Sequence, residues 1–357
     1  MAVLNRCSMR NAGTRICGLS FLLLGVLAMG FGQDTAATGA GRGRGGRGAP
    51  NSGANAPVLN YKLVDWPTEA KSTAGFPAGP WNFIQVASVA ANTDGNILVL
   101  HRGAHPVMEF EPGGKFVRSW GDELFSEAKV VFVPAVNKTP EISGYSAVYG
   151  PPACTNCGAH AVRVDPQGNI WLIDATGHIV YKLNQKRDVI MRLGAKGVAG
   201  GGPKNFNLPT DIAFGPNGDL YVADGYGSAR IVKFSKDGKF LLEFGKRGTG
   251  PGEFGLPHSV AVDAQGKVYV SDRDNGRIEV FDANGKFLSE WAGTGGYSAI
   301  DVTKDQQIWT GVVLRDLNGK PIGKLPGSGG HGGIAITASG DIYIGQLSGK
   351  VDKYAKQ

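Results

Sequence analysis

The sequence predicts an all-β fold, a six-bladed β-propeller, from three observations: abundant glycine, alternating apolar residues and a motif repeated six times. Glycine accounts for 56 of the 357 residues, and charged residues for 19%. This composition favours many short strands joined by tight turns. No stretch of helical periodicity runs longer than two turns, so no helical fold competes with this prediction.

Each copy of the motif contains alternating apolar residues, a polar turn with glycine, and a strand that often ends near aspartate. The copies span Val89–Leu100, Val162–Asp174, Ile212–Asp224, Val260–Asp272, Ile300–Trp309 and Ile334–Ile344. Most copies continue into a second hairpin, as in Ile231–Phe240, which turns at Asp237-Gly238. Two hairpins make a four-stranded blade, and six copies of roughly 45–50 residues each match a propeller.

The last copy, which ends at Val351–Tyr354, has residues for only three strands. A ring left open there would expose a strand edge to other chains. We therefore expect the early segment Tyr61–Trp66 to supply the missing outer strand and close the ring.

The first 32 residues are expected to form a signal peptide. Arg6, Arg10 and Arg15 precede the apolar run Ile16–Gly32, and small residues at its end suit cleavage before Gln33. An uncleaved membrane anchor is the alternative, although the run is short for a spanning helix. The signal predicts a secreted or periplasmic protein, in which Cys154 and Cys157 form a local disulfide by default.

Residues 33–57 are expected to form a disordered Gly/Arg-rich linker, because this composition buries no core. The propeller then occupies 58–357. The formal charge of +7 is concentrated at the start of the chain: residues 1–57 hold six Arg and one Asp, or +5, which leaves +2 for the rest. A nucleic-acid partner is excluded because the propeller carries no basic excess that would form a binding face.

Three of the six histidines recur at one position of the repeat. His160 lies ten residues before Ile170, His258 ten before Val268, and His331 eleven before Ile342. First strands line a propeller channel, so these imidazoles from alternate blades should converge on the axis. Three imidazoles with an open fourth position are typical of catalytic zinc, and copper or nickel also accept these ligands. The alternative for each histidine taken alone is a turn residue bonded to backbone.

Further motifs carry a resemblance to a known family. They are His101-Arg102-Gly103, Asp224-Gly225-Tyr226, Pro257-His258-Ser259 and the string Asp272–Ile278, set among copies that look like NHL repeats. With these motifs the chain resembles the peptidyl-α-hydroxyglycine α-amidating lyase (peptidylamidoglycolate lyase) family of NHL-repeat β-propellers, over residues from about 80 to 350.

The resemblance implies a zinc-dependent carbon–nitrogen lyase. Such an enzyme cleaves the N–Cα bond of peptidyl-α-hydroxyglycine, or a related α-hydroxy amide, into an amide and glyoxylate. It implies that zinc is held by His160, His258 and His331, that Tyr226 is the general base, and that Arg102 and Arg273 bind the carboxylate. It also implies a structural Ca²⁺ on the backbone carbonyls of Val89 and Val162.

The sequence departs from the family pattern at three places near the site. Gly332 follows the third histidine where the family has an aspartate that completes the calcium site, the methionine before that histidine is missing, and Gly227 replaces the cysteine after the tyrosine. No copper monooxygenase domain accompanies the propeller motifs.

Two other functions remain open at this point. One is a non-catalytic secreted NHL propeller that binds protein or glycan, and the other is a metal-dependent hydrolase or lactonase on a similar propeller. Lactonase sites of that kind are rich in carboxylates, whereas the motifs here are rich in histidine. We expect a monomer that acts on a small-molecule or peptide substrate and has no membrane partner after signal cleavage.

Overall fold

The computed structural model describes residues 52–67, 83, 85–126, 131–132, 147–148, 158–327 and 332–357, all of which belong to one compact unit, Gly39–Gln357. The expected signal peptide, most of the expected linker, both cysteines of the expected disulfide and His331 lie outside these residues. Within the described part, no helix combines the length and the hydropathy that crossing a membrane requires.

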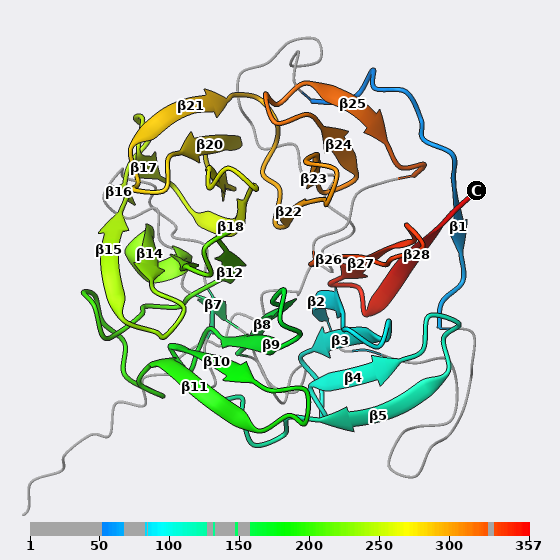
Figure 1. The fold of residues 1–357 in the computed structure, drawn as a ribbon, viewed down its shortest axis with the longest axis horizontal. Coiled ribbons are helices and arrows are strands. Elements are labelled where there is room, and N and C mark those ends of the chain that lie inside the picture. The colour runs from blue at the N-terminus through cyan, green and yellow to red at the C-terminus, as the bar shows by residue number, and fades with distance from the viewer. Residues whose placement is uncertain are drawn as a thin grey trace, which may run out of the picture. The chain divides into compact units, whose positions relative to one another are not determined.

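Six four-stranded antiparallel sheets form the blades of a β-propeller, as predicted (Figure 1). Blade 1 contains β2 (Val86–Ala91), β3 (Ile97–His101), β4 (Val107–Phe110) and β5 (Phe116–Trp120). Blade 2 contains β8 (Ala159–Val164), β9 (Ile170–Asp174), β10 (Ile179–Leu183) and β11 (Val189–Gly194). Blade 3 contains β12 (Asp211–Phe214), β13 (Leu220–Asp224), β14 (Arg230–Phe234) and β15 (Phe240–Phe244).

The second half of the ring repeats this order. Blade 4 contains β18 (Pro257–Val262), β19 (Val268–Asp272), β20 (Arg277–Phe281) and β21 (Phe287–Trp291). Blade 5 contains β22 (Ile300–Val302), β23 (Ile308–Thr310), β24 (Val313–Arg315) and β25 (Pro321–Lys324). Blade 6 contains β26 (Ile334–Ile336), β27 (Ile342–Gln346), β28 (Lys350–Lys356) and β1 (Tyr61–Val64).

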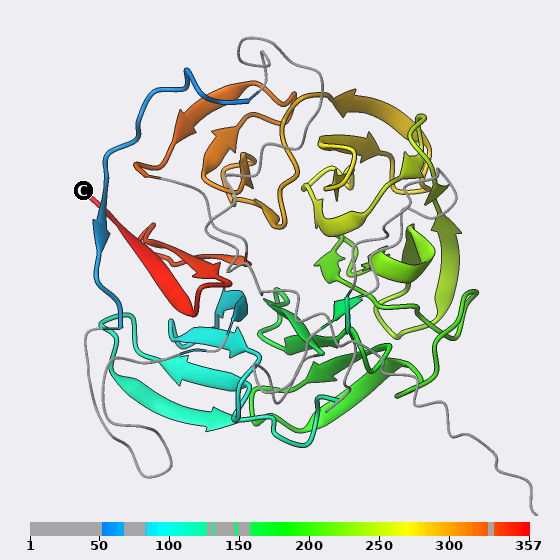
Figure 2. The ribbon, with the colours of Figure 1, turned by 180° about the vertical axis from the view of Figure 1, so that it is seen from behind.

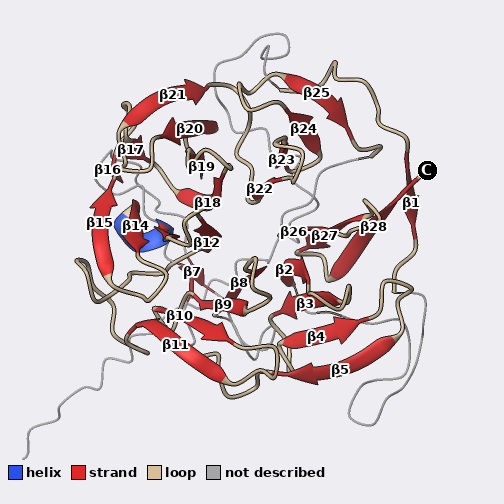
Figure 3. Ribbon diagram, viewed as in Figure 1, coloured by secondary structure: helices blue, strands red, loops and turns tan. Residues whose placement is uncertain are grey.

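The remaining elements are short connections. They are the pairs β6 (Val131–Phe132) with β7 (Ala147–Val148) and β16 (Lys246–Arg247) with β17 (Glu253–Phe254), and the one-turn helix α1 (Gly225–Ser228), coloured blue in Figure 3. Apolar side chains fill the space between neighbouring sheets. One such cluster joins Trp171 and Ile173 of blade 2 to Leu220 and Val222 of blade 3, and all four side chains are buried. Burying alternate residues of both sheets is what stacks the blades.

The ring is closed by the early segment, which confirms the prediction for Tyr61–Trp66. β1 pairs antiparallel with β28, with Tyr61 opposite Lys356 and Leu63 opposite Tyr354. Views from both faces place this strand at the perimeter of blade 6 (Figures 1 and 2). The first strand of every blade is therefore innermost.

A buried aspartate ends the second strand of blades 2, 3 and 4. In blade 3, Asp224 accepts a hydrogen bond from the backbone N–H of Asn207 at 2.7 Å and pairs with Arg230 Nε at 3.0 Å. Burial raises the pKa of Asp224, although the charge of Arg230 acts in the opposite direction. The carboxylate thus ties the loop that enters the blade to the blade itself.

Blade 1 carries His101 at the place of this aspartate. His101 lies opposite Val86, as Asp272 lies opposite Pro257 in blade 4. Burial lowers its pKa to about 4, so the imidazole is neutral at ordinary pH. Its Nδ1 accepts a hydrogen bond from Gly103 N–H at 3.2 Å, and its Nε2 lies 3.1 Å from the His105 carbonyl oxygen. His101 therefore stabilises the loop that contains Gly103 and His105, which is a structural role.

Glu279 of β20 is fully buried. Its Oε1 accepts a hydrogen bond from Gly252 N–H at 3.1 Å and lies 3.4 Å from Arg277, whereas its Oε2 has no hydrogen-bond partner among the described residues. Burial raises the pKa of Glu279 to about 7 against the opposing charge of Arg277. The folded protein therefore favours the protonated carboxyl.

Glu279→Gln is expected to raise the free energy of unfolding at pH 8 by up to about 3 kcal/mol and to change it little at pH 5. The wild type loses stability as the pH rises from about 4.5 to about 7, because the folded state holds a proton that the unfolded chain releases. Urea unfolding of both proteins at each pH measures the difference. A difference that does not grow with pH would contradict the burial effect.

Candidate metal centre and its tyrosine

His160 and His258 each sit at a β-bulge in the first strand of their blades. The register of β8 against β9 shifts between Ala159 and Ala161, and that of β18 against β19 shifts between Pro257 and Ser259. A bulge leaves one residue outside the ladder and redirects its side chain. The bulge is what turns both imidazoles toward the axis.

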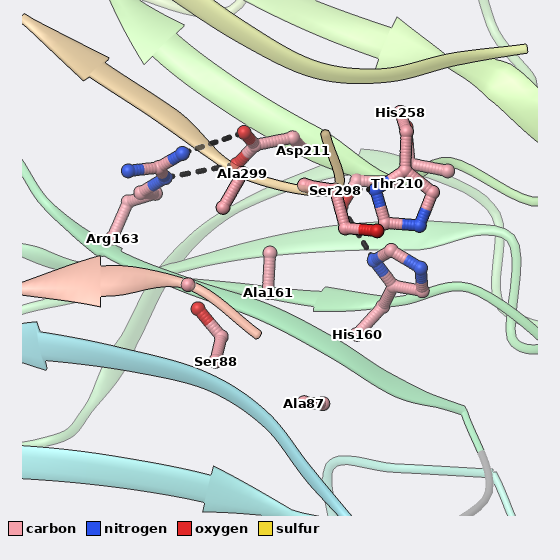
Figure 4. Close-up of a pocket in the computed structure, with 11 residues that line it drawn as sticks. Ala87, Ser88, His160, Ala161, Arg163, Thr210, Asp211, His258, Ser298 and Ala299 are labelled. Atoms are coloured by element: carbon pink, nitrogen blue, oxygen red, sulfur yellow. Dashed lines mark hydrogen bonds and ion pairs between the residues drawn. The ribbon is translucent and has the colours of Figure 1, made fainter. Parts of the chain in front are cut away.

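Each imidazole is oriented by a carbonyl group of the next blade. His160 Nδ1 donates to Thr210 O at 2.7 Å, and His258 Nδ1 donates to Ser298 O at 2.8 Å (Figure 4). A carbonyl oxygen only accepts, so the proton of each neutral ring lies on Nδ1 and Nε2 presents a lone pair. This is the orientation that protein structures give to metal-binding histidine.

Tyr226 brings its hydroxyl to both rings. Its Oη lies 3.1 Å from His160 Nε2 and 3.1 Å from His258 Nε2, and the two imidazole centroids are 4.9 Å apart. A hydroxyl has one hydrogen, whereas both nitrogens present lone pairs. The two imidazole nitrogens therefore converge on one buried point beside the phenol oxygen, and their two lone pairs suit a divalent cation.

The turn α1, which carries Tyr226, is held by backbone contacts. Tyr226 N–H donates to Leu208 O at 3.3 Å, and Gly227 N–H donates to Asn207 O at 2.9 Å. The Asn207 side chain also occupies the space that a side chain at position 227 would need. In this chain Asn207 packs where the family pattern places a cysteine.

Arg247 fastens the same turn from the other side. Its Nη2 donates to Tyr226 O at 3.1 Å and its Nη1 to Gly255 O at 3.0 Å, so it connects the tyrosine turn to the loop that leads into His258. Arg247 is not among the residues that the sequence predicts for the site, because a guanidinium that bonds two carbonyl oxygens in different loops leaves no local pattern.

The two arginines of the predicted site flank this cluster. Arg102 is buried, and it donates through Nε to Ala159 O at 3.2 Å and through Nη1 to Gln85 Oε1 at 2.9 Å, directly beside the His160 bulge. The Arg273 guanidinium lies 5.9 Å from the centroid of the Tyr226 ring, and its Nε lies 3.2 Å from Asp274. The structure thus brings together Tyr226, two histidines and both arginines.

His331 lies outside the described residues, so the three-histidine centre stays a prediction. Among the residues that are described, no three His, Cys, Asp or Glu side chains are grouped closely enough to hold a metal. The two described histidines still fit zinc, because each directs a deprotonated nitrogen at the same point.

The calcium site that the resemblance implies lacks its carboxylate in this chain, because position 332 is glycine. The Val162 carbonyl accepts a hydrogen bond from Ser88 Oγ at 3.3 Å, and Val89 lies in regular register opposite Val99. Gly332 packs against Gly345 so closely that an added Cβ would lie 3.0 Å from its backbone. An aspartate there would need the two segments to move apart.

Comparisons with known proteins agree with the propeller fold. A family model described as a 6-bladed beta-propeller matches residues 211–311. Peptidyl-glycine alpha-amidating monooxygenase B of Xenopus laevis is 32% identical over 216 residues, which is 58% of this chain and 24% of the relative. Peptidyl-alpha-hydroxyglycine alpha-amidating lyase 1 of Drosophila melanogaster is 28% identical over 231 residues, 60% of this chain and 41% of the relative.

The chain is thus similar in sequence to amidating lyases. It spans about a quarter of the length of the frog monooxygenase and about two fifths of the fly lyase. A structure of streptogramin B lyase is 14% identical, with a TM-score of 0.53 over 84% of this chain and 98% of that one. That likeness supports the propeller fold alone, whereas the sequence matches are to proteins named for peptide amidation.

Gly225→Ala is expected to destabilise the protein by about 1–3 kcal/mol, because the added Cβ would collide with the backbone oxygen of Pro257, next to His258. Gly201→Ala, at a position with open space around it, is the matched control and should stay within about 0.5 kcal/mol of the wild type. Urea unfolding measures both variants. Equal stability of the two would argue against a close contact between the tyrosine turn and β18.

Proposed function

We propose that this chain is a zinc lyase that cleaves the N–Cα bond of peptidyl-α-hydroxyglycine, or of a related α-hydroxy amide, to give an amide and glyoxylate. The observation that carries the proposal is the position of Tyr226 Oη, 3.1 Å from Nε2 of both His160 and His258. The homology to amidating lyases supports the same chemistry.

Zinc would be held by His160 and His258 together with His331, which the repeat spacing supplies as the third ligand. When bound, the metal supplies a Lewis acid that stabilises negative charge on the α-oxygen of the substrate. Beside the histidines lies a cavity of about 20 Å³, lined by both rings and by Thr210 and Ser298. This volume holds about one water molecule, so most of a substrate must lie outside it.

The proposed reaction balances without an oxidant and without water. The α-hydroxyl of the substrate loses its proton, and its C–O bond becomes the aldehyde of glyoxylate. The electron pair of the N–Cα bond leaves with the nitrogen, which takes up one proton to become the primary amide. Tyr226 is the group placed to move that proton, because a general base must lie within hydrogen-bond reach of it.

Arg102 and Arg273 are proposed to bind the substrate carboxylate, which becomes the carboxylate of glyoxylate. A planar guanidinium offers paired donors to a carboxylate. Arg102 is held by Ala159 O and Gln85, and Arg273 lies against the Tyr226 ring, so both have defined positions before substrate binds. Such preorganisation lowers the cost of stabilising charge as it develops.

We also propose that the protein works outside the cytoplasm, in secreted or periplasmic form, as a monomer that acts on a small molecule or peptide. The apolar run Ile16–Gly32 after three arginines supports export. The hydroxylated substrate would then come from a separate oxygen-dependent hydroxylation of a glycine-extended compound.

His258→Ala is expected to lower the affinity for zinc on the order of 100-fold or more, since loss of a ligand should exceed the loss of a residue that only orients one. Zinc content of purified protein, measured by mass spectrometry after equilibration with a zinc buffer, tests this expectation. His105→Ala is the control, because His105 is partly exposed and pairs with Asp122. A His258→Ala protein that retains stoichiometric zinc would refute the ligand assignment.

Tyr226→Phe is expected to retain zinc and to lower kcat by roughly 10²–10⁴-fold, because it removes only the hydroxyl that moves the proton. Glyoxylate release from α-hydroxyhippurate measures kcat, with Tyr61→Phe on the outer strand as control. Turnover equal to the wild type would exclude Tyr226 as the base. Wild-type protein that binds zinc and releases no glyoxylate would instead favour a non-catalytic propeller that binds protein or glycan.

A further inference from the structure

One position of the first strand distinguishes blades 2 and 5 from the other four. In those four blades the residue that follows the buried Val or Ile of this strand is alanine, whereas blade 2 has arginine and blade 5 has aspartate. In blade order the six residues are Ala90, Arg163, Ala213, Ala261, Asp301 and Ala335. Blades 2 and 5 face one another across the ring (Figure 1). A cation and an anion therefore occur at opposite points of the innermost strands.

Arg163 reaches from blade 2 to the first strands of the blades beyond it. Its Nε and Nη2 form a bidentate pair with the two carboxylate oxygens of Asp211 in blade 3, at 2.9 Å and 2.6 Å (Figure 4). Nη2 also donates to the carbonyl oxygen of Ile300 in blade 5 at 3.1 Å, and Nη1 lies 3.7 Å from Asp301.

Blade 4 joins the same network through Ser259. Its hydroxyl donates to Asp211 at 2.5 Å and accepts a hydrogen bond from Ile300 N–H at 3.1 Å, and Arg163 Nη2 lies 3.4 Å from it. A single guanidinium thus connects the innermost strands of four consecutive blades.

The pair is well shielded from solvent, since the Arg163 side chain is 12% exposed and that of Asp211 is 4% exposed. Burial alone would lower the pKa of Arg163, but the charge and hydrogen bonds of Asp211, with the charge of Asp301, outweigh it and raise the pKa. The guanidinium is therefore charged at every pH at which the protein folds. Removing one partner of such a pair leaves an uncompensated buried charge.

We propose that the Arg163 guanidinium is the structural cation of the channel, a role that the resemblance gives to calcium. It lines the same cavity as Ala161 and Ser88, whose hydroxyl bonds the Val162 carbonyl. It supplies a fixed positive charge that gathers oxygen atoms from several first strands, as a bound cation would. This inference does not depend on the lyase activity.

Loss of the guanidinium would leave a set of hard oxygen donors without their cation. The carboxylates of Asp211 and Asp301, the Ile300 carbonyl and the Ser259 hydroxyl all surround the space that Arg163 fills. Carboxylate, carbonyl and hydroxyl oxygens are ligands of the hard kind that calcium prefers. Arg163→Ala should therefore create a response to calcium that the wild type lacks.

Thermal unfolding of the full chain, in zinc-buffered solution freed of calcium, tests the proposal when millimolar calcium or magnesium is added. The wild-type Tm should be the same in both salts. Arg163→Ala should lower Tm on the order of 10 °C, and calcium should restore part of this loss while magnesium should not. Arg192→Ala, which removes an exposed arginine from β11, should leave Tm nearly unchanged.

A wild-type Tm that rises with calcium and not with magnesium would overturn the proposal, and so would an Arg163→Ala protein as stable as Arg192→Ala or without a response to calcium. If Arg163→Ala fails to fold, Arg163→Lys keeps the charge without the paired donors and should show a smaller loss of Tm. Glyoxylate release plays no part in these measurements, so failure of the lyase proposal would leave their outcome intact.

Discussion

The site depends on a bulge in the innermost strand of blades 2 and 4. Without it, the residue at position 160 or 258 would stay in the β-ladder, and its side chain would point into the sheet packing. With it, each imidazole reaches the carbonyl group of the next blade, which sets the tautomer and directs Nε2 inward. In blades 2 and 4, ring orientation and protonation state are therefore consequences of one backbone irregularity, the shift in strand register.

Two layers of contact hold the innermost strands together at different depths. In one layer the imidazoles bond to Thr210 O and Ser298 O, and in the other Arg163 bonds to Asp211 and Ile300, close along the same strands. The first layer keeps the Nε2 lone pairs of the two histidines directed at a shared point. The second layer pairs the charge of Arg163 with that of Asp211 and holds the blades in position relative to one another. The chemistry and the cohesion of the channel therefore use neighbouring residues for separate purposes.

Much of the fold follows from the sequence, because blade formation is local. Alternation, Asp-Gly and Asn-Gly turns and the repeat spacing predict the hairpins, and the missing fourth strand of the last copy predicts closure by Tyr61–Trp66. The ten-residue spacing to the second strand places His160 and His258 at equivalent positions, and the structure puts both at the axis.

The remaining contacts are not local, and the sequence shows them less directly. Arg163 and Ile300 are 137 positions apart, and only the ring brings them together. The alanines at the equivalent position of four blades were the available signal, since a charged residue at a position that is otherwise a buried alanine needs a counter-charge. Arg247 and Asn207 left no such signal, because they act through backbone atoms that every residue possesses.

Closure of the ring by β1 and β28 has a consequence for how the protein folds. β1 is synthesised before five complete blades and finds its partner only after all of them exist. Until then, blade 6 lacks its outer strand, and β1 presents unsatisfied backbone groups to any chain nearby. Contacts between such distant segments form slowly. Before β1 pairs with β28, the chain is thus most prone to associate with a second copy, and a chaperone would assist its folding most at this stage.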